Sequence, residues 1–280
     1  MKNFNYRVVN DNEFVITDYT GDDTIVNIPS EIDGKPVTSI GDFAFEGCTS
    51  LTSIEIPASV TSIGYDAFDS CTNLTNIEIP DSITSIGNFS FYGCIGLTSI
   101  EIPASVTSIG YATFYACTSL ASININSNNA KYSSTDGVLF NKTRTTLIFY
   151  PTGKTNTRYT IPNSVKYIQD YAFRGYRSLT NIEIPDSVIS IGFGAFMGCT
   201  SLTNIEIPDS VTYIGNFSFE DCTSLTNIEI PNGITGIGER AFGYYYDNGY
   251  KKINGFTIKG IKGSEAERYA RENDFKFETI

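Results

Sequence analysis

The chain of 280 residues has a formal net charge of −12, with 19 basic side chains, 31 acidic side chains and no histidine. This balance excludes a nucleic-acid backbone as an expected partner, because binding to phosphates requires clustered Lys and Arg side chains. The lack of histidine excludes Ser-His-Asp and Cys-His catalysis and every histidine metal site. No apolar stretch approaches the ~20 residues of a membrane-spanning helix, so we expect no membrane span.

The first residues predict a structural cap. Residues 1–10 begin with a basic side chain but contain no apolar segment of the kind that a signal peptide needs. Two extended segments, Phe4–Val9 and Phe14–Asp18, flank the turn-forming residues 10–12. We therefore expect an N-terminal hairpin within a cap that spans residues 1–27.

One sequence pattern then returns every 23 residues, in the form I-x-I-P-x-S-V-T-x-I-G-x-x-A-F-x-x-C-T-S-L-T-x. A proline marks the copies at Pro57, Pro80, Pro103, Pro162, Pro185, Pro208 and Pro231. A fixed period of this length predicts a solenoid, in which each coil covers the apolar side of its neighbour. We expect one elongated domain, with four coils over residues 28–123 and four over residues 161–243.

Each copy predicts two extended segments and a short helical turn. In Leu51–Pro57, Ile54 and Ile56 alternate with polar residues, which is the period of a half-buried strand. The proline ends this strand because it cannot donate a hydrogen bond to the ladder. A second extended segment, Ser59–Ile63, ends at a glycine corner, and Tyr65–Cys71 is long enough for one helical turn. Successive coils should lie ~4.8 Å apart, as neighbouring strands do.

Two apolar residues recur at fixed positions and predict the core. The first set is Phe45, Phe68, Phe91, Phe114, Phe173, Phe196, Phe219 and Phe242. The second set is Ile40, Ile63, Ile86, Ile109, Ile168, Ile191, Ile214 and Ile237. Large apolar side chains in register remove the most area from water, so we expect both sets to be buried.

Cysteine also holds one repeat position, which Tyr176 takes once. The cysteines are Cys48, Cys71, Cys94, Cys117, Cys199 and Cys222. In a parallel stack their Cβ atoms should lie ~4.8 Å apart, whereas a disulfide prefers ~3.8 Å. A row of thiols without histidine also suits the tetrahedral coordination of zinc poorly. We expect buried free thiols and no metal site; disulfides between neighbouring coils and metal ligation are the alternatives.

Residues 124–160 interrupt the repeat. Strands are expected at Gly137–Asn141 and Thr146–Tyr150, joined by a turn at Lys142–Thr145. The resulting hairpin would widen one coil of the solenoid.

The last segment, residues 244–280, predicts a C-terminal cap. Ser264 and Glu267 have the spacing of a capping box, which favours a helix to about Asn273, and a closing strand is expected at Phe275–Thr279. Capped ends argue against end-to-end polymerisation, so we expect a monomer.

An acidic side chain recurs on the outward side of the first strand of the coils. The residues are Glu55, Glu78, Glu101, Glu183, Glu206 and Glu229. The surrounding charge is one-sided, because no Lys or Arg occurs between Lys35 and Lys131. Stacked like charges repel by roughly 1 kcal/mol per pair at most in a water-like dielectric. Two interpretations stay open: a solvated face that keeps the protein soluble, or a docking stripe for a cation or a basic partner.

Specific recognition is expected where the copies differ, especially where they acquire Tyr or Arg, the residues enriched in binding hot spots. Between the internal phenylalanine and the cysteine position, some copies have a tyrosine or an arginine. Elsewhere a tyrosine replaces the serine of the second segment or belongs to the aromatic loop of residues 244–250. These candidates are Tyr92, Tyr115, Tyr167, Arg174, Tyr213 and Tyr245. Partial packing between coils is the alternative.

The repeat resembles the BspA-like leucine-rich repeat, also called the Treponema pallidum type. The resemblance covers nearly the whole chain, including STDGVLFNK and LIFYP within residues 134–151 and GSEAERYARENDFKF at residues 263–277. It implies an α/β leucine-rich-repeat fold that is mostly β with short helical turns. The solenoid would be curved and right-handed, with a parallel sheet on its concave face. It also implies a secreted or surface-attached bacterial protein that binds other proteins, and it supplies no catalytic residue.

We therefore expect a non-enzymatic module for adhesion or host interaction, without a cofactor, that recognises a protein through its concave face and irregular loops. The alternative is a structural spacer that holds other domains away from the cell surface. The resemblance implies an extracellular or cell-surface location; because no signal peptide is present, the cytoplasm is the alternative.

Overall fold

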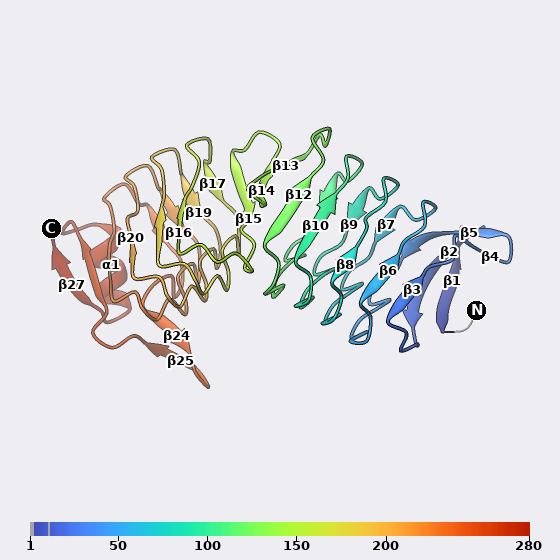
Figure 1. Ribbon diagram of the computed structural model, residues 1–280. Helices are drawn as coiled ribbons and strands as arrows, with labels where there is room; N and C mark the ends of the chain where they lie inside the picture. Colours follow the sequence, from blue (N-terminus) through green and yellow to red (C-terminus); the bar gives the residue numbers. More distant parts are fainter. Residues whose placement is uncertain (1–2, 11) are drawn as a thin grey trace. The chain divides into compact units, whose positions relative to one another are not determined.

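The computed structural model describes residues 3–10 and 12–280. The chain divides into two compact units: unit 1 is Met1–Lys142 with Pro151–Gly153, and unit 2 is Thr143–Tyr150 with Lys154–Ile280. The predicted fold class is confirmed, because each unit is a mostly β, parallel-strand solenoid (Figure 1). The organisation of the coils as a single domain stays a prediction.

Two strands alternate along each coil of unit 1. The first strands are β3 (Ile25–Asn27), β6 (Ser53–Glu55), β8 (Asn76–Ile77), β10 (Ser99–Ile102) and β12 (Ser122–Ile125). The second strands are β5 (Lys35–Ile40), β7 (Ser62–Ile63), β9 (Ser85–Ile86) and β11 (Ser108–Ile109). The second strands form one parallel ladder, whereas the first strands pair as β3-β6-β8 and separately as β10-β12.

Unit 2 repeats this arrangement. Its first strands are β16 (Arg158–Thr160), β18 (Asn181–Glu183), β20 (Asn204–Ile205), β22 (Asn227–Glu229), β26 (Thr257–Gly260) and β27 (Lys276–Thr279). Its second strands are β15 (Thr146–Phe149), β17 (Tyr167–Ile168), β19 (Ser190–Ile191), β21 (Tyr213–Ile214) and β23 (Gly236–Ile237). The second strands again form one ladder, and the first strands pair as β16-β18-β20 and β22-β26-β27.

The second strands are shorter than the sequence predicts. Only Ser62 and Ile63 of the expected segment Ser59–Ile63 form β7. The Val60 N–H donates to the Pro57 carbonyl at 3.0 Å, so the start of the segment is a turn.

The expected helical turn after each glycine corner is a series of tight turns and not a helix. In residues 65–71 the N–H groups alternate between two kinds of acceptor. Those of Phe68 and Ser70 donate to the next coil, to the carbonyls of Ser90 and Tyr92, both at 2.8 Å. The N–H of Asp69 donates within its own coil, to the carbonyl of Asp66 at 3.0 Å. A helix would direct all of these bonds along the chain, so inter-coil bonding prevents one.

The predicted phenylalanine core is confirmed, since all eight side chains are at most 2% exposed. Their rings stack along each unit with centroids 5.2–5.9 Å apart from Phe45 to Phe114 and 4.9 Å apart from Phe173 to Phe242. Burial of each such side chain contributes about 2–3 kcal/mol. We call these residues the inner phenylalanine row.

The isoleucine set is buried with two exceptions, Ile109 and Ile237, which are only half-buried. They lie on β11 and β23, and no further parallel second strand follows either one in its own unit. The expectation of full burial is therefore wrong at these ends, because no isoleucine of a following coil covers them.

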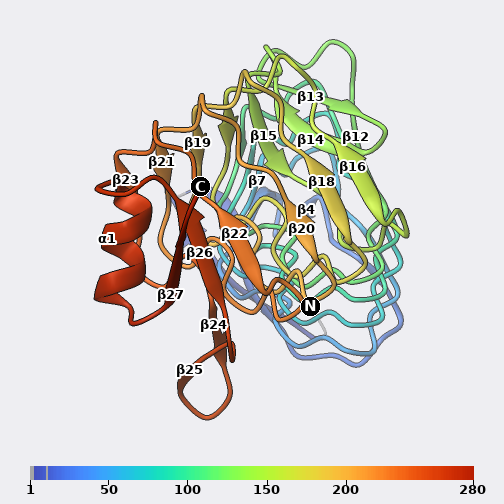
Figure 2. The same cartoon turned by 90° about the vertical axis from the view of Figure 1, so that its left-hand side faces the viewer.

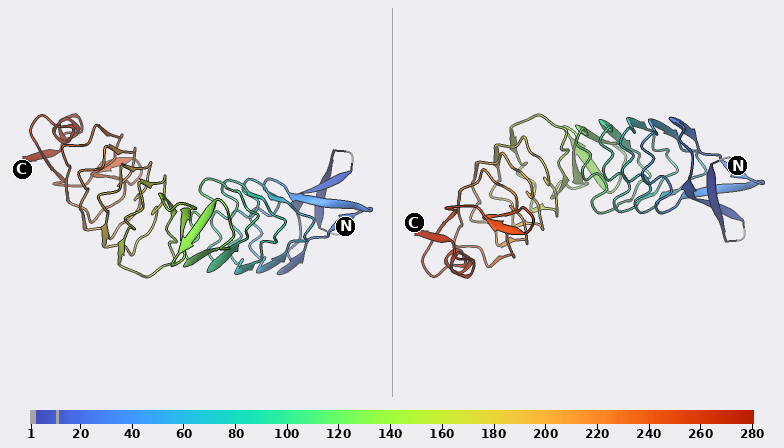
Figure 3. Two further views of the ribbon diagram at one scale, coloured as in Figure 1. Left: turned by 90° about the horizontal axis from the view of Figure 1, so that it is seen from above. Right: turned by 90° about the horizontal axis from the view of Figure 1, so that it is seen from below.

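Both ends of the chain have the predicted caps. At the N-terminus, β1 (Phe4–Val9) and β2 (Glu13–Tyr19) pair antiparallel (Figure 3). The Tyr19 ring stacks on Phe45, with centroids 5.4 Å apart. The expected turn at residues 10–12 includes Asp11, which lies outside the described residues.

At the C-terminus, α1 (Glu265–Glu272) packs beside β26 and β27 (Figure 2). The hydroxyl of Tyr269, on α1, donates to the Phe242 carbonyl at 3.0 Å and closes the inner phenylalanine row. The capping box is not formed. The Glu267 carboxylate accepts the N–H of Gly263 and not that of the N-cap residue Ser264, whose hydroxyl makes no capping bond.

The irregular segment contains the two expected strands, as β14 (Val138–Asn141) and β15. Their pairing as a hairpin stays a prediction, because they belong to different units. Within unit 1, β14 pairs antiparallel with an additional strand, β13 (Tyr132–Thr135). Asp136 and Gly137 join them with φ values of 50° and 75°. Such an Asp-Gly pair is typical of a type I′ hairpin turn, so the sequence contained a signal for this hairpin.

Candidate partner-binding surfaces

The repeated glutamates lie on the first strands or directly after them, and all six side chains are exposed. Because side chains alternate along a strand, the neighbouring isoleucines point into the core instead. Ile54, Ile77 and Ile100, for example, are at most 5% exposed. The sheet therefore presents these carboxylates to solvent, and they take no part in the packing of the core.

The surroundings of these glutamates differ between the units. In unit 1, Glu101 is in register with Asn124. In unit 2, the Thr160 hydroxyl donates to Glu183 at 2.8 Å, and Glu229 is in register with Lys259. Unit 2 therefore places a basic residue next to its acidic stripe, whereas the stripe of unit 1 falls in the stretch without Lys or Arg.

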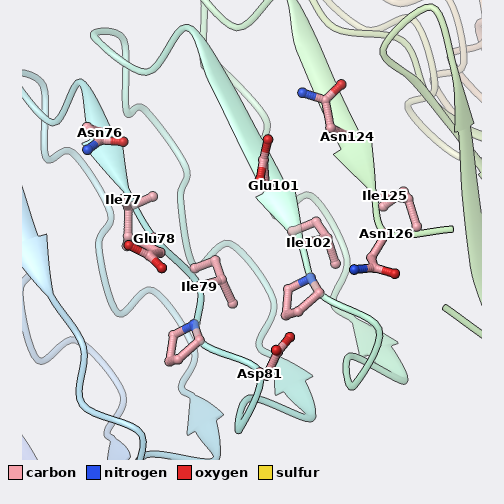
Figure 4. A pocket seen from close by; sticks show the side chains of 12 residues that line it. Asn76, Ile77, Glu78, Ile79, Asp81, Glu101, Ile102, Asn124, Ile125 and Asn126 are labelled. Carbon is pink, nitrogen blue, oxygen red and sulfur yellow. The ribbon is translucent and has the colours of Figure 1, made fainter. Parts of the chain in front are cut away.

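A shallow groove of about 540 Å³ lies on the first strands of unit 1 (Figure 4). It extends over β8, β10 and β12, where β8 and β10 are not paired by hydrogen bonds. Its lining includes the carboxylates of Glu78, Asp81 and Glu101 and the amides of Asn124 and Asn126. The groove thus combines negative charge with hydrogen-bonding groups.

The tyrosine and arginine candidates do not join the glutamates. Tyr92 and Tyr115 lie on the turns that follow the glycine corners, with ring centroids 5.2 Å apart. Arg174 lies on the corresponding turns of unit 2, where its guanidinium is 4.8 Å from the Tyr171 ring. These turns connect the second strand of one coil to the first strand of the next.

The remaining candidates occupy two other places. Tyr167 and Tyr213 are 45% and 49% exposed on the second strands β17 and β21, with Ser190 in register between them. Tyr245 belongs to a hairpin, β24 (Tyr244–Tyr246) with β25 (Tyr250–Lys252), where an exposed loop was expected. It is half-buried. The structure therefore distributes the predicted site residues over several faces.

The expectation of free thiols is confirmed: all six cysteines are unpaired, and every one except Cys48 is buried. Each buried thiol donates to the carbonyl of a phenylalanine of the preceding coil, as from Cys117 to Phe91 at 2.9 Å. Burial raises the pKa of the Cys117 thiol to about 12. The described residues contain no group of three or more Cys, Asp or Glu side chains placed to hold a metal ion.

A second set of aromatic side chains lies just after the glycine corners and was not singled out from the sequence. In unit 1 it is Phe43, Tyr65, Phe89 and Tyr111, with successive centroids 5.2–5.7 Å apart in edge-to-face contact. In unit 2 it is Tyr171, which follows Gln169 at the corner position, Phe193 and Phe217; Tyr250 of the β24–β25 hairpin extends the row, with successive centroids 5.1–6.2 Å apart. We call these the outer aromatic rows. The sequence contained a signal for these rows, because successive coils have an aromatic residue at the first or second position after the corner.

Glu220 is a further residue that the repeat pattern did not distinguish. Its side chain is 2% exposed, and its Oε2 atom has no hydrogen-bond partner. Burial, and to a lesser extent the charge of Asp221, raises the pKa of Glu220 to about 7, while Arg240 and Arg174 act in the opposite direction. The same repeat position holds the exposed Glu46 in unit 1.

Among the described residues, no helix is long and apolar enough to cross a membrane. A family model for the BspA-type leucine-rich repeat region matches residues 38–158 and 147–260, in 6 copies. No curated protein matches the chain.

Several solved structures are similar to the chain. The pneumococcal vaccine antigen PcpA has 19% sequence identity, with 100% of this chain and 98% of that chain covered and a TM-score of 0.70. A leucine-rich cell surface protein from Faecalibacterium prausnitzii A2-165 has 27% identity, coverage of 88% and 94%, and a TM-score of 0.51. A leucine-rich repeat protein from Eubacterium ventriosum ATCC 27560 has 24% identity, coverage of 86% and 92%, and a TM-score of 0.52.

Proposed function

The chain belongs to the BspA-type leucine-rich repeat proteins, and from this premise we propose that it is a non-enzymatic, protein-binding module. The observation that carries the proposal is the groove of unit 1, in which three carboxylates and three amides face solvent on the first strands. Rigid elements hold polar groups in place without the entropy cost of ordering a loop. We infer that a protein with a basic surface binds there.

We further propose that the protein acts as a monomer on the outside of a bacterial cell, in adhesion or host interaction. The cell surface protein of Faecalibacterium prausnitzii supports this location by its similarity in fold and sequence. Antibody labelling of intact cells tests it, and signal that appears only after lysis would contradict it.

The binding proposal is tested by passing extracellular-matrix and host surface proteins over the immobilised full chain. The pair of substitutions Glu78→Lys and Glu101→Lys should weaken the binding of a captured partner by about tenfold or more, since two charges in the groove are reversed. Glu206→Lys is the matched control, because it changes the same repeat position in unit 2. Partner binding that is unaffected by the groove substitutions would overturn the assignment of the groove.

A structural spacer is the competing function. It requires no binding surface, so a folded chain that captures no protein at micromolar concentration would favour the spacer.

A further inference from the structure

Three of the four members of the outer aromatic row of unit 1 are exposed to solvent. Phe43 is 47% exposed and Tyr65 is 39% exposed, although both are large and largely apolar. Their edge-to-face contacts, 5.2 Å between centroids, leave part of each ring face uncovered. Phe89 continues the row at 5.7 Å from Tyr65. Exposed apolar groups that lie next to one another in this way commonly mark an interaction surface.

In the equivalent row of unit 2, two arginines of the chain itself lie against the rings, although Tyr250 stays 46% exposed. The guanidinium of Arg240 lies 3.9 Å from the ring centroid of Tyr250 and 5.8 Å from that of Phe217. The guanidinium of Arg174 lies 4.8 Å from the ring of Tyr171. The chain therefore shows that a guanidinium is accommodated against the rings of an outer aromatic row.

Unit 1 has carboxylates where unit 2 has these cations. Asp66 occupies the repeat position of Arg240, with nearly the same backbone conformation, φ 50° against 49°. Asp42 and Glu46 are exposed next to the row, and Asp69 follows Asp66 by three residues. Burial, together with the negative charges of Asp69, Glu46 and Asp42, raises the pKa of Asp66, so these carboxylates act on one another. The row of unit 1 thus combines exposed ring faces with uncompensated negative charge.

We propose that the outer aromatic row of unit 1 is a docking surface for an arginine-bearing segment of a partner protein. A guanidinium is attracted to the faces of aromatic rings and pairs with carboxylates through its planar donors. A lysine ammonium has the same charge but no planar face to stack, so it binds the rings less well. The inference rests on the proposed protein-binding function and adds a second surface, on the turns instead of the groove.

The direct test titrates the full chain with an arginine–glycine peptide and with a lysine–glycine peptide of equal length and charge, by calorimetry. The arginine peptide should bind about threefold tighter or more, which corresponds to the usual strength of exposed cation–π contacts. Tyr65→Ala should weaken arginine-peptide binding by about threefold. Tyr213→Ala, which removes an exposed tyrosine elsewhere, should leave the binding unchanged. Circular dichroism verifies that each variant is folded.

A second variant supplies the missing arginine from within the chain. Asp66→Arg should cover the row as Arg240 does in unit 2 and weaken peptide binding by about tenfold. Asp66→Lys is the matched control: it makes the same change of charge, but it should weaken the binding less because it cannot stack.

Three outcomes would overturn the proposal. Equal affinity for the two peptides would show that the surface binds positive charge in general and does not recognise arginine. Unchanged arginine binding in Tyr65→Ala would remove the row from the site. Self-association of the chain that Tyr65→Ala abolishes would identify a second copy as the occupant. The groove substitutions Glu78→Lys and Glu101→Lys lie elsewhere in the coil, so they test the proposed function independently of this inference. If they abolish partner capture while the arginine peptide shows no preference, the proposed function stands and only this inference fails.

Discussion

The two units have the same inner phenylalanine row but differ in what lies over the outer one. In unit 2, Arg174 and Arg240 lie against rings of the outer aromatic row, and the carboxyl of Glu220 is buried. In unit 1, the same repeat positions place Asp66 and Glu46 beside exposed rings. The comparison teaches that the repeat defines a common scaffold, while single substitutions outside the core decide which surface is available to a partner.

The largest expected effect tests whether the two cores are equivalent. Phe68→Ala in unit 1 and Phe196→Ala in unit 2 should each lower the free energy of unfolding by about 3–5 kcal/mol, because each removes a fully buried ring. Urea unfolding followed by circular dichroism measures the change. Tyr213→Ala, at an exposed ring, is the control and should cost under ~0.5 kcal/mol. If the substitution in one unit lowered the free energy of unfolding by less than ~1 kcal/mol, the two cores would not be equivalent.

The next effect concerns the buried carboxyl of unit 2. The pKa of Glu220 is raised from 4.5 to about 7 in the folded state. The stability that the protonated Glu220 contributes is therefore fully present below pH ~4.5 and is lost as the pH rises through ~7, because the folded state resists ionisation of this carboxyl. Between pH 4.5 and 8 the free energy of unfolding of the native chain should fall by about 2–3 kcal/mol more than that of Glu220→Gln.

Urea unfolding at both pH values measures this difference. Glu46→Gln is the matched control, because it changes the same repeat position where the side chain is exposed. A pH dependence that is the same in the native chain and in Glu220→Gln would show that the carboxyl ionises normally.

A smaller effect is expected from uncovering the outer row of unit 2. Arg240→Ala removes the guanidinium from the Tyr250 and Phe217 rings and breaks its 2.8 Å ion pair with Glu239. The expected loss of stability is about 1 kcal/mol. It should also raise the pKa of Glu220 further, because a nearby positive charge is lost. Arg240→Lys keeps the charge without the planar group, so it should restore the pKa more than the stability. Equal recovery of both would argue against stacking.

The smallest effect compares the acidic stripes. Glu229→Lys places a second positive charge in register with Lys259 and should cost ~0.3–0.5 kcal/mol. Glu101→Lys faces the neutral Asn124, so it should change stability by under ~0.5 kcal/mol and not in a consistently unfavourable direction. Thermal unfolding at low salt measures both, and high salt should reduce the difference. A larger cost for Glu101→Lys would mean that this glutamate has a structural role.

Much of the fold followed from the sequence because the features that specify it are periodic. The spacing of Phe45 and its equivalents predicted their common burial, and the shared cysteine position predicted free thiols. The helical turn was wrong, because propensity within one coil gives no information on the N–H groups of Phe68 and Ser70 that bond to the next coil. The hairpin through Asp136 and Gly137 was missed, although its turn chemistry was present in the sequence.

The site was less predictable than the fold. The sequence predicted the exposure of the glutamates, but it gave no information on which of the tyrosine and arginine departures share a face with them. These departures lie on the second strands, on the turns and on the β24–β25 hairpin. The outer aromatic rows were overlooked because most of their members alternate between the first and the second position after the corner, and Tyr250 comes from the β24–β25 hairpin.

The sequence by itself determined the coil, its inner phenylalanine row and its outward glutamates, because residues that recur every 23 positions meet their own equivalents in the neighbouring coil. Only the tertiary structure decided that Arg240 lies against the Tyr250 ring, that Glu220 is buried and that the rings of Phe43 and Tyr65 are exposed without an arginine against them. These three features depend on contacts between residues that are not equivalent in the repeat, within neighbouring coils and with the hairpin. The 23-residue period gives no information on such contacts.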